Sequence, residues 1–441
     1  MDIERKLLDL IPESMAGRGR VTLEALLAPI KDVLNRRRFP ERPLSDTQVE
    51  IMLQLLSSMD SDKDPDAARV GEREGRTASP LLSRLSAAFN HGVGRSGHLA
   101  APQPKAVGAS LMQQVADTVA TDAIRKLGLD NVHYGLVTPL STGMSIALIL
   151  AALRRETGAQ EVLYPRIDHL SPSRGIAFAG LAEVQVPTVL KGDAVCADLG
   201  ALEQLMRKHA SSVVLLTTTF FPPRESDPVK DIAKLCSEAG NPLVINNAYG
   251  VQSEEIMRNV RSAVDAGRVD VVVQSSDKNF LSPVGGSVVV SPDKQVMKWA
   301  AETYAGRATA APIVQTLAAL LVIGLEGYNQ LRKEQVANRA LLEDRLREIA
   351  GTIGQRVLSV DNPVSCAMTL DGLDVEQVGA ELYNLRVTGP RAVTKGAYGS
   401  CIEGYPHSYL VMNAAIGAKQ KDVEDATSKL NRALGSPSSM L

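Results

Sequence analysis

Short apolar runs alternate with helical segments over most of this chain, from about residue 107 onward. The runs are rich in β-branched residues and occupy positions 161–165, 212–218, 242–246, 269–275 and 285–291. Amphipathic stretches with apolar residues at helical spacing separate most of them. Strands of this kind, joined by helices, form a mostly parallel sheet that is covered on both faces. The sequence therefore predicts an α/β fold built on one large sheet.

The flanking segments differ from this pattern. Residues 1–60 read as helices, and residues 61–106 are polar and rich in glycine, which is more typical of a functional loop than of filler. A long helical stretch, 310–350, leads into a smaller segment of strands and helices. We predict three parts. They are an N-terminal helical extension with a functional loop (1–106), a large domain (107–310), and a linking helix with a small α+β domain (311–441).

Composition narrows the function classes. Aromatic residues make up 4% of the chain, which argues against recognition of unpaired bases mainly by stacking. The net charge of −2 gives no global signal for nucleic acid, although a local basic patch remains compatible with RNA binding. The four cysteines form no CxxC pair, so we predict free thiols in a reducing compartment and no metal site. The charged N-terminus predicts no signal peptide, and we expect a cytoplasmic protein without a membrane span.

Three segments carry candidate chemistry. Residues 141–145 (STGMS) open a helix, where free backbone N–H groups bind anions, although the same residues also cap ordinary helices. Asn246 and Asn247 follow a strand at the edge where open α/β sheets bind ligands, although a plain turn is an equally good reading. Lys278 follows a buried strand that ends in Ser275. Such a lysine is often merely solvated, but at this edge it could form an imine.

The order of these segments is similar to that of aspartate-aminotransferase-type enzymes, which use pyridoxal phosphate (PLP). Longer strings then identify a family. They closely resemble O-phosphoseryl-tRNA:selenocysteinyl-tRNA synthases, and the resemblance extends to about residue 434. The strings are HGVGRSG, PQPKAVGASL, STGMS, FFPPR, NNAYG, SSDKN, PVGG, YAGRA, YNLRVTGPR and VMNAAIG. The short C-terminus looks like the archaeal branch. This resemblance implies PLP fold type I, with PLP as the cofactor.

The resemblance also implies roles for residues around the cofactor. Lys278 forms the Schiff base, Asn246 faces the pyridine nitrogen with Asn247 beside it, and His169 stacks on the ring or touches substrate. An ordinary loop histidine is an equal alternative for His169. The family has a lysine where this chain has Leu170, which puts any cationic contact there in doubt. The remaining residues assigned to the cofactor, mainly to its phosphate, are Ser141, Thr142, Gly143, Met144 and Ser275.

A second set of residues matches the family's site for the substrate phosphate: Arg73, Arg95, Ser96, Gln103 and Arg307. Planar guanidinium groups hold a phosphoseryl group bidentately. Structural ion pairs are the alternative for any one arginine, and Arg73 does lie between two glutamates. Arginines left unpaired in a desolvated pocket disfavour seryl-tRNA, which lacks the phosphate.

Arg36, Arg37 and Arg38 end a predicted helix. Cations favour a helix C-terminus electrostatically, and this explanation has the same weight as a contact with the RNA backbone. By resemblance the protein is a homotetramer in which dimers share active sites and the N-terminal helices meet the acceptor arm of tRNA(Sec). Arg391 then lies near the terminal unpaired base of the tRNA.

The predicted reaction removes phosphate from phosphoseryl-tRNA(Sec) and adds selenium from selenophosphate, with Lys278 as the base. No DNA partner is expected. One rival reading is a phosphoseryl-tRNA:cysteinyl-tRNA synthase that uses a sulfur donor. Another is a tRNA-binding scaffold without catalysis, which would not show a cofactor absorbance band near roughly 420 nm. The least specific reading is an α/β protein with an unrelated small-molecule site.

Overall fold

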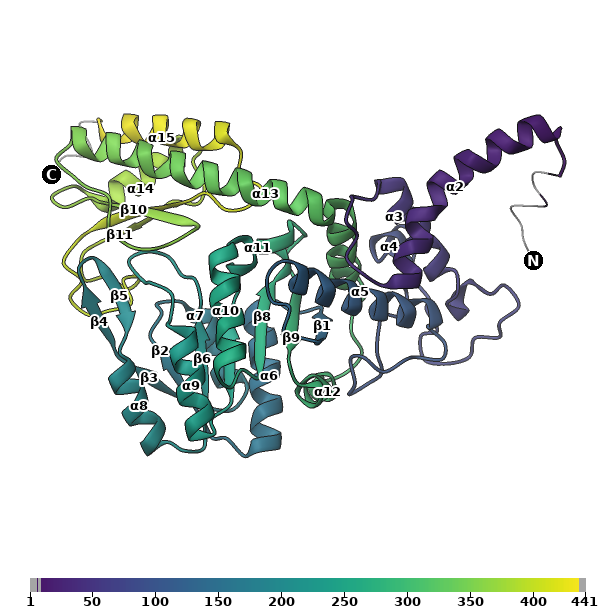
Figure 1. Ribbon diagram of the computed structural model, residues 1–441, viewed down its shortest axis with the longest axis horizontal. Helices are drawn as coiled ribbons and strands as arrows, with labels where there is room; N and C mark the ends of the chain where they lie inside the picture. Colours follow the sequence, from purple (N-terminus) through teal and green to yellow (C-terminus); the bar gives the residue numbers. More distant parts are fainter. Residues whose placement is uncertain (1–5, 7–8, 436–441) are drawn as a thin grey trace.

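A computed structural model describes residue 6 and residues 9–435, and its centre is a sheet of seven strands in the order β1-β9-β8-β7-β6-β2-β3 (Figure 1). Only β9 runs against its neighbours, so the remaining strands point the same way and the sheet is mostly parallel, as predicted. The strands are β1 Tyr134–Thr138, β2 Glu161–Pro165, β3 Ala182–Val186, β6 Ser212–Thr217, β7 Leu243–Asn246, β8 Val271–Ser275 and β9 Ser287–Ser291.

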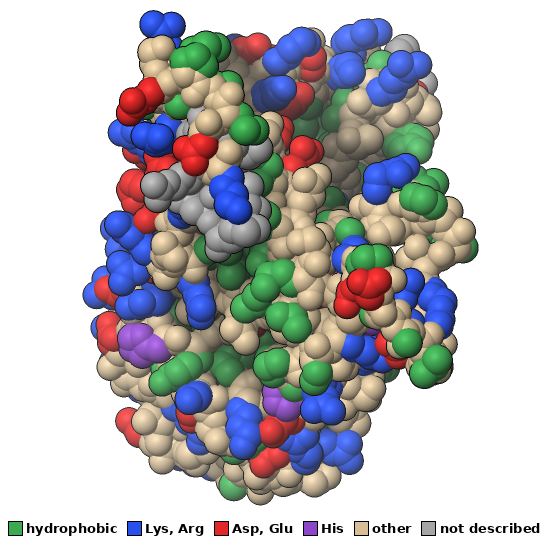
Figure 2. Space-filling model, turned by 90° about the vertical axis from the view of Figure 1, so that its right-hand side faces the viewer, with side chains coloured by type: hydrophobic (Ala, Val, Ile, Leu, Met, Phe, Trp, Pro, Cys, Tyr) green, Lys and Arg blue, Asp and Glu red, His purple; other side chains and the backbone are tan. Residues whose placement is uncertain are grey.

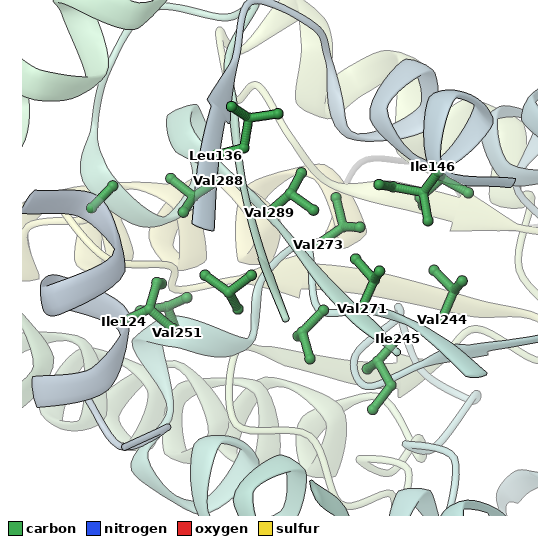
Figure 3. Close-up of a cluster of buried hydrophobic side chains, with 14 of the residues drawn as sticks. Ile124, Leu136, Ile146, Val244, Ile245, Val251, Val271, Val273, Val288 and Val289 are labelled. Atoms are coloured by element: carbon green, nitrogen blue, oxygen red, sulfur yellow. The ribbon is translucent and has the colours of Figure 1, made fainter. Parts of the chain in front are cut away.

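The predicted apolar runs became the five strands β2, β6, β7, β8 and β9. All residues of β6, β7, β8 and β9 are buried, because helices cover the sheet. Figure 3 shows valine and isoleucine side chains of β7, β8 and β9 projecting from the strands into a dry cluster. The helices of this region are α5 Val107–Lys126, α6 Thr142–Thr157, α7 Leu170–Phe178, α8 Leu199–Lys208, α9 Val229–Ala239, α10 Glu254–Ala266, α11 Ser276–Phe280 and α12 Lys294–Thr303.

The N-terminal helices join the main core. They are α2 Glu13–Arg36 and α3 Asp46–Ser57, the latter started by a capping box between Ser45 and Gln48. Buried residues of both helices, including Val33 and Met52, belong to the same hydrophobic cluster as the sheet. The loop that follows holds the short helices η1 Ser61–Lys63 and α4 Pro80–Leu85.

The predicted long helix is α13 Ala311–Thr352, which breaks at Gly324. A Cβ there would lie 2.7 Å from the backbone N of Pro43, and φ is +61°, so only glycine fits this close approach. Residues 40–44 form hydrogen bonds with backbone groups of α13 that the break leaves unpaired. For example, the Leu44 N–H donates to the Leu321 carbonyl at 2.9 Å.

Among the described residues, α13 is the one helix long and apolar enough to span a membrane, by length and composition alone. Residues 311–325 carry no charged side chain. Ile313, Leu317 and Leu320 of this stretch are buried in the main core, however, and α13 packs against α5 and α11. The helix therefore has a place in the core of the fold.

The C-terminal segment is an antiparallel sheet with its own hydrophobic cluster, to which the second half of α13 contributes. Its strands are β10 Ser365–Thr369, β11 Arg391–Val393 and β12 Tyr409–Asn413, and its helices are α14 Val375–Asn384 and α15 Gln420–Leu434. A small hairpin, β4 Thr188–Lys191 and β5 Ala194–Ala197, lies beneath this sheet (Figure 1).

Candidate active site

A cavity of about 110 Å³ lies at the carboxyl edge of the central strands. It draws residues from the ends of β2, β6, β7 and β8 and from the start of α6, segments that are distant in the sequence. Five of the predicted cofactor residues line it: Thr142, Gly143, His169, Asn246 and Lys278. Four others do not, namely Ser141, Met144, Asn247 and Ser275.

Lys278 lies in the single turn of α11 that continues from β8. Its Nζ sits 4.6 Å from the centre of the Tyr249 ring, a favourable cation–π arrangement. Burial lowers the pKa of the Lys278 amine, while the charge of Asp277 acts in the opposite direction. The amine therefore loses its proton more easily than an ordinary lysine, as a nucleophile or base requires.

The start of α6 also lines the cavity. The N-cap Ser141 makes no side-chain capping bond, and the Thr142 hydroxyl oxygen is buried without a hydrogen-bond partner in the described part of the chain. At Gly143 a Cβ would lie 2.0 Å from Ser171 Oγ, so the backbone approaches α7 as only glycine allows. Free N–H groups and an unpaired hydroxyl suit an anion.

Asn246 and Asn247 face different ways. Asn247 is fully buried, and its Oδ1 accepts a hydrogen bond from the Thr218 hydroxyl at 2.7 Å. Asn246 lines the cavity, and its Oδ1 accepts from the Ala248 N–H at 3.3 Å, which leaves its amide group free to donate. Asn247 is therefore a structural residue, which corrects its assignment as a cofactor contact. Ser275 is likewise occupied, because its buried hydroxyl donates to Asp277.

His169 caps the N-terminus of α7, where its Nδ1 accepts from the Ser171 N–H at 3.2 Å. Burial of the ring lowers the pKa of His169, and the charges of Lys278 and Arg391 lower it further. The imidazole is therefore held neutral with its proton on Nε2. Leu170, the next residue, is 55% exposed and offers no charge.

Sequence reasoning gave no role to the aromatic residues Phe220, Phe221 and Tyr249, which line the cavity. The Phe220 ring meets His169 edge-on at 6.0 Å, and Phe221 meets Tyr249 in the same way at 6.4 Å. The Arg391 guanidinium lies 4.9 Å from the centre of the Phe221 ring. The strings FFPPR and NNAYG contain Phe220, Phe221 and Tyr249, but only the fold brings these three rings into one cavity.

A second cavity, of about 750 Å³, gathers most of the residues predicted for the substrate phosphate. Arg73, Ser96, Gln103 and Arg307 line it, together with Arg76 and Lys105, which were not predicted. Arg95 is exposed and is not part of the lining of this cavity, although the adjacent Ser96 is.

The arginines of this cavity are not consumed by ion pairs. Glu74 pairs with Lys105 at 2.6 Å, and no ion pair engages Arg73 within the described residues. Arg307 donates to the His91 carbonyl, yet its buried Nε has no partner there. Burial lowers the pKa of Arg307, and the charge of Arg73 adds to this effect. Two neighbouring guanidinium groups with spare donors form a site for a phosphate group.

The two cavities share no lining residue. In a single chain, Lys278 and Arg307 therefore line separate cavities. The arginines Arg36, Arg37 and Arg38 are exposed at the end of α2 and line neither cavity. Across the residues that the structure covers, no group of three or more His, Cys, Asp or Glu side chains forms a metal site.

Comparison with known proteins identifies relatives. Residues 59–435 match the family model described as O-phosphoseryl-tRNA(Sec) selenium transferase, SepSecS. The chain is 44% identical to the O-phosphoseryl-tRNA(Sec) selenium transferase of Methanopyrus kandleri, over 96% of this chain and 99% of that protein. The crystal structure of an archaeal SepSecS superposes with a TM-score of 0.93 at 41% identity, covering 96% of this chain and 98% of that one.

A more distant structure, of SPT with PLP, has a TM-score of 0.57 at 15% identity and covers 81% of this chain and 84% of that one. At this identity the likeness concerns the fold alone. The chain accordingly has the fold of type I PLP-dependent enzymes, as predicted.

Proposed function

This chain belongs to the O-phosphoseryl-tRNA(Sec) selenium transferase family, and we propose that it converts phosphoseryl-tRNA(Sec) to selenocysteinyl-tRNA(Sec) with PLP and selenophosphate. One observation carries the proposal: a half-buried lysine amine of lowered pKa lines the same cavity as Thr142 and Gly143, which form an anion cradle at the start of α6. The second cavity, with its spare guanidinium donors, supports a phosphorylated substrate.

The residues of the first cavity fit PLP. Thr142 and the backbone N–H groups of Thr142 and Gly143 would hold the cofactor phosphate, and Lys278 would hold its aldehyde carbon covalently. Asn246 would donate to or accept from the pyridine nitrogen, and the neutral His169 would pack near the ring. When bound, PLP supplies an electron sink that makes the substrate's Cα proton acidic.

Asn246 cannot provide the negative charge that keeps a pyridine nitrogen protonated. The electron sink is then weaker than with an aspartate in that place. Such a sink is sufficient for loss of phosphate, which is a good leaving group, and it disfavours transamination and decarboxylation. The choice of asparagine therefore supports an elimination reaction.

In the proposed reaction, Lys278 removes the Cα proton of the phosphoseryl group as a general base. The Cβ–O bond then breaks, and phosphate departs with the electron pair. Selenium of selenophosphate adds to Cβ, Lys278 returns the proton to Cα, and water cleaves the Se–P bond to release a second phosphate. Arg73 and Arg307 would hold the phosphate of each substrate in turn.

We also propose a cytoplasmic homotetramer in which the two cavities meet across a subunit boundary. The apolar face on the N-terminal side of the molecule supports this assembly. Figure 2 shows hydrophobic side chains in the middle of that face. The N-terminal segment carries several exposed apolar residues, among them Leu55, Met59, Leu81, Leu82 and Leu85. Contiguous exposed apolar side chains mark protein interfaces.

Incubation with phosphoseryl-tRNA(Sec) and selenophosphate tests the function, with the aminoacyl product identified by mass after deacylation. We expect selenocysteine, and none from Lys278→Ala or without selenophosphate. Cysteine formed from a sulfur donor, with no selenocysteine, would assign the rival reaction. Unchanged phosphoserine, from protein that holds its cofactor, would contradict the proposed function.

A further inference from the structure

Glu74 places a carboxylate among the cations of the second cavity. Its Oε1 lies 2.6 Å from Nζ of Lys105, and its side chain is only 15% exposed. Arg73, Arg76 and Arg307 line the same cavity. The hydrogen bond from Lys105 holds the pKa of Glu74 below its ordinary value, so the carboxylate is ionised at neutral pH. Glu74 therefore occupies one of the cationic donors that a phosphate group would use.

Glu72, two residues earlier, provides a contrast. It lines the same cavity, but it is exposed and forms no ion pair within the described residues. The two glutamates thus carry the same charge on the same loop, and only Glu74 engages a cation of the cavity. The pairing with Lys105 is specific to position 74.

The backbone that carries Glu74 is strained. Residues 73–76 form a turn in which the Arg76 N–H donates to the Arg73 carbonyl at 3.0 Å. The two central residues both have positive φ, +48° at Glu74 and +69° at Gly75. Glycine, asparagine and aspartate dominate turns of this kind, so a glutamate in the first central position is unfavourable for the backbone. Strained residues cluster at sites where the side chain has a functional task.

Lys105 lies on a better anchored part of the chain. Its carbonyl accepts the Ser61 N–H at 3.1 Å and the Ser61 hydroxyl at 2.9 Å. The next residue, Ala106, forms a β-bridge with Asp60. These contacts hold the backbone of Lys105 beside the cavity. The ion pair can therefore open by a movement of the strained turn, with the lysine left in place.

We propose that Glu74 competes with the substrate phosphate for Lys105 and is displaced from it when the phosphate binds. A phosphoseryl group carries about −1.5 to −2 charges and three acceptor oxygens, whereas the carboxylate carries a single charge. The phosphate therefore gains Lys105 as a ligand beside Arg73 and Arg307. This inference rests on the proposed function.

The competition has a consequence for product release. Each turnover of the proposed reaction leaves two phosphate ions, and both must depart. Because the pair of Glu74 and Lys105 has to open before phosphate can use the lysine, the apparent affinity for free phosphate is lowered. The returning carboxylate thus favours departure of the product.

The test measures binding of inorganic phosphate to the holoenzyme by titration calorimetry. Glu74→Gln nearly keeps the size of the side chain and removes its charge, so Lys105 is released and phosphate affinity should rise by about tenfold. Glu72→Gln is the matched control, because it removes the same charge from the same cavity without releasing a cation. We expect a gain of about twofold for this control.

The double variant Glu74→Gln/Lys105→Ala separates competition from simple charge repulsion. Competition acts through Lys105, so the gain should disappear and the affinity should return to about the wild-type value. A gain that persists without Lys105 would overturn the inference, because Glu74 would then act only by repelling phosphate. Glu74→Gln that binds phosphate no more tightly than Glu72→Gln would overturn it as well.

These measurements do not depend on the reaction. Wild-type enzyme that forms selenocysteine, combined with equal phosphate affinities of the two single variants, contradicts the inference and leaves the proposed function standing. Wild type that returns phosphoserine unchanged, combined with a tenfold gain that requires Lys105, refutes the function and leaves the competition between Glu74 and phosphate standing.

Discussion

Lys278 shows how a neighbouring charge sets the chemistry of one side chain. Burial lowers the pKa of its amine, and the negative charge of Asp277 raises it, because that charge stabilises the ammonium form. In Asp277→Asn this stabilisation is lost, so the pKa of Lys278 should fall further. The neutral amine is the reactive form, and the rate of PLP uptake by the apoenzyme should therefore begin to rise at a lower pH than in wild type. Stopped-flow absorbance near about 420 nm follows the uptake, and an unchanged or higher midpoint would contradict this account.

The need for glycine at position 143 can be tested by a substitution that creates a clash and a second substitution that relieves it. In Gly143→Ala the new Cβ would lie 2.0 Å from Ser171 Oγ, so the start of α6 must move away from α7 and the anion cradle opens. We expect PLP affinity to fall by about tenfold, roughly 1.4 kcal/mol, which is the scale of one lost hydrogen bond.

The rescue is Gly143→Ala/Ser171→Ala. The nearest remaining side-chain atom, Cβ of residue 171, would lie 3.4 Å from the new methyl group, which is a tolerable contact. Affinity should return toward the wild-type value in a PLP titration of the apoenzyme. If PLP affinity does not recover, the Ser171 hydroxyl is not the group that prevents a side chain at position 143.

At the scale of elements, the strands with the most apolar sequences were predictable and the others were not. The runs that became β6 to β9 are buried on both faces, so their sequences had to be continuously apolar. β3 lies at the sheet edge with mostly exposed residues, and β1 begins with exposed Tyr134, so neither gave a clear run. Asn247 was misassigned for a related reason. Asn246 lines the cavity. Because side chains alternate in direction along an extended chain, the side chain of Asn247 lies in the core instead.

The connection between β2 and the C-terminal sheet depends on Asp168, which sequence reasoning passed over. Its carboxylate accepts the Gly399 and Cys401 N–H groups, both at 2.8 Å, and pairs with Arg166 at 2.8 Å. The residue is 3% exposed. Asp168→Ala leaves two buried N–H groups and a guanidinium without an acceptor, so we expect a loss of about 3–5 kcal/mol of unfolding free energy.

The pH dependence of this loss follows from the pKa of Asp168. Burial alone would raise it, but Arg166 and the two N–H groups lower it overall. The stability that the carboxylate provides is thus complete above the ordinary carboxyl pKa and is lost as the pH falls through the lowered one. The difference in Tm between wild type and variant should be large at neutral pH and shrink in acid. A difference independent of pH would show that the ionised form is not what matters.

At the scale of the whole molecule, the residues predicted for one active site are divided between two cavities. Lys278 and Arg307 were assigned to one reaction by resemblance, yet the cavities that hold them share no residue. Sequence spacing gives no information on this point, because contacts between copies of a chain leave no period or motif in it. The division of the chain into three parts stays a prediction, and the N-terminal helices share the core of the sheet.

Mixed oligomers decide whether the active site is composite. Lys278→Ala and Arg307→Ala should each be inactive alone, because each lacks one half of every site. If a site combines Lys278 of one subunit with Arg307 of its partner, a mixed dimer holds one intact site and one doubly defective site. Random assembly makes half of the dimers mixed, so co-expression should restore about a quarter of the wild-type activity.

The control is co-expression of wild type with the double variant Lys278→Ala/Arg307→Ala. Its mixed dimers hold two sites with one defect each and are inactive. Only dimers of two wild-type chains are active, and these again make up about a quarter of the total. No activity from the two single variants, with mixed dimers confirmed by differential tags, would place both residues in a site within one chain.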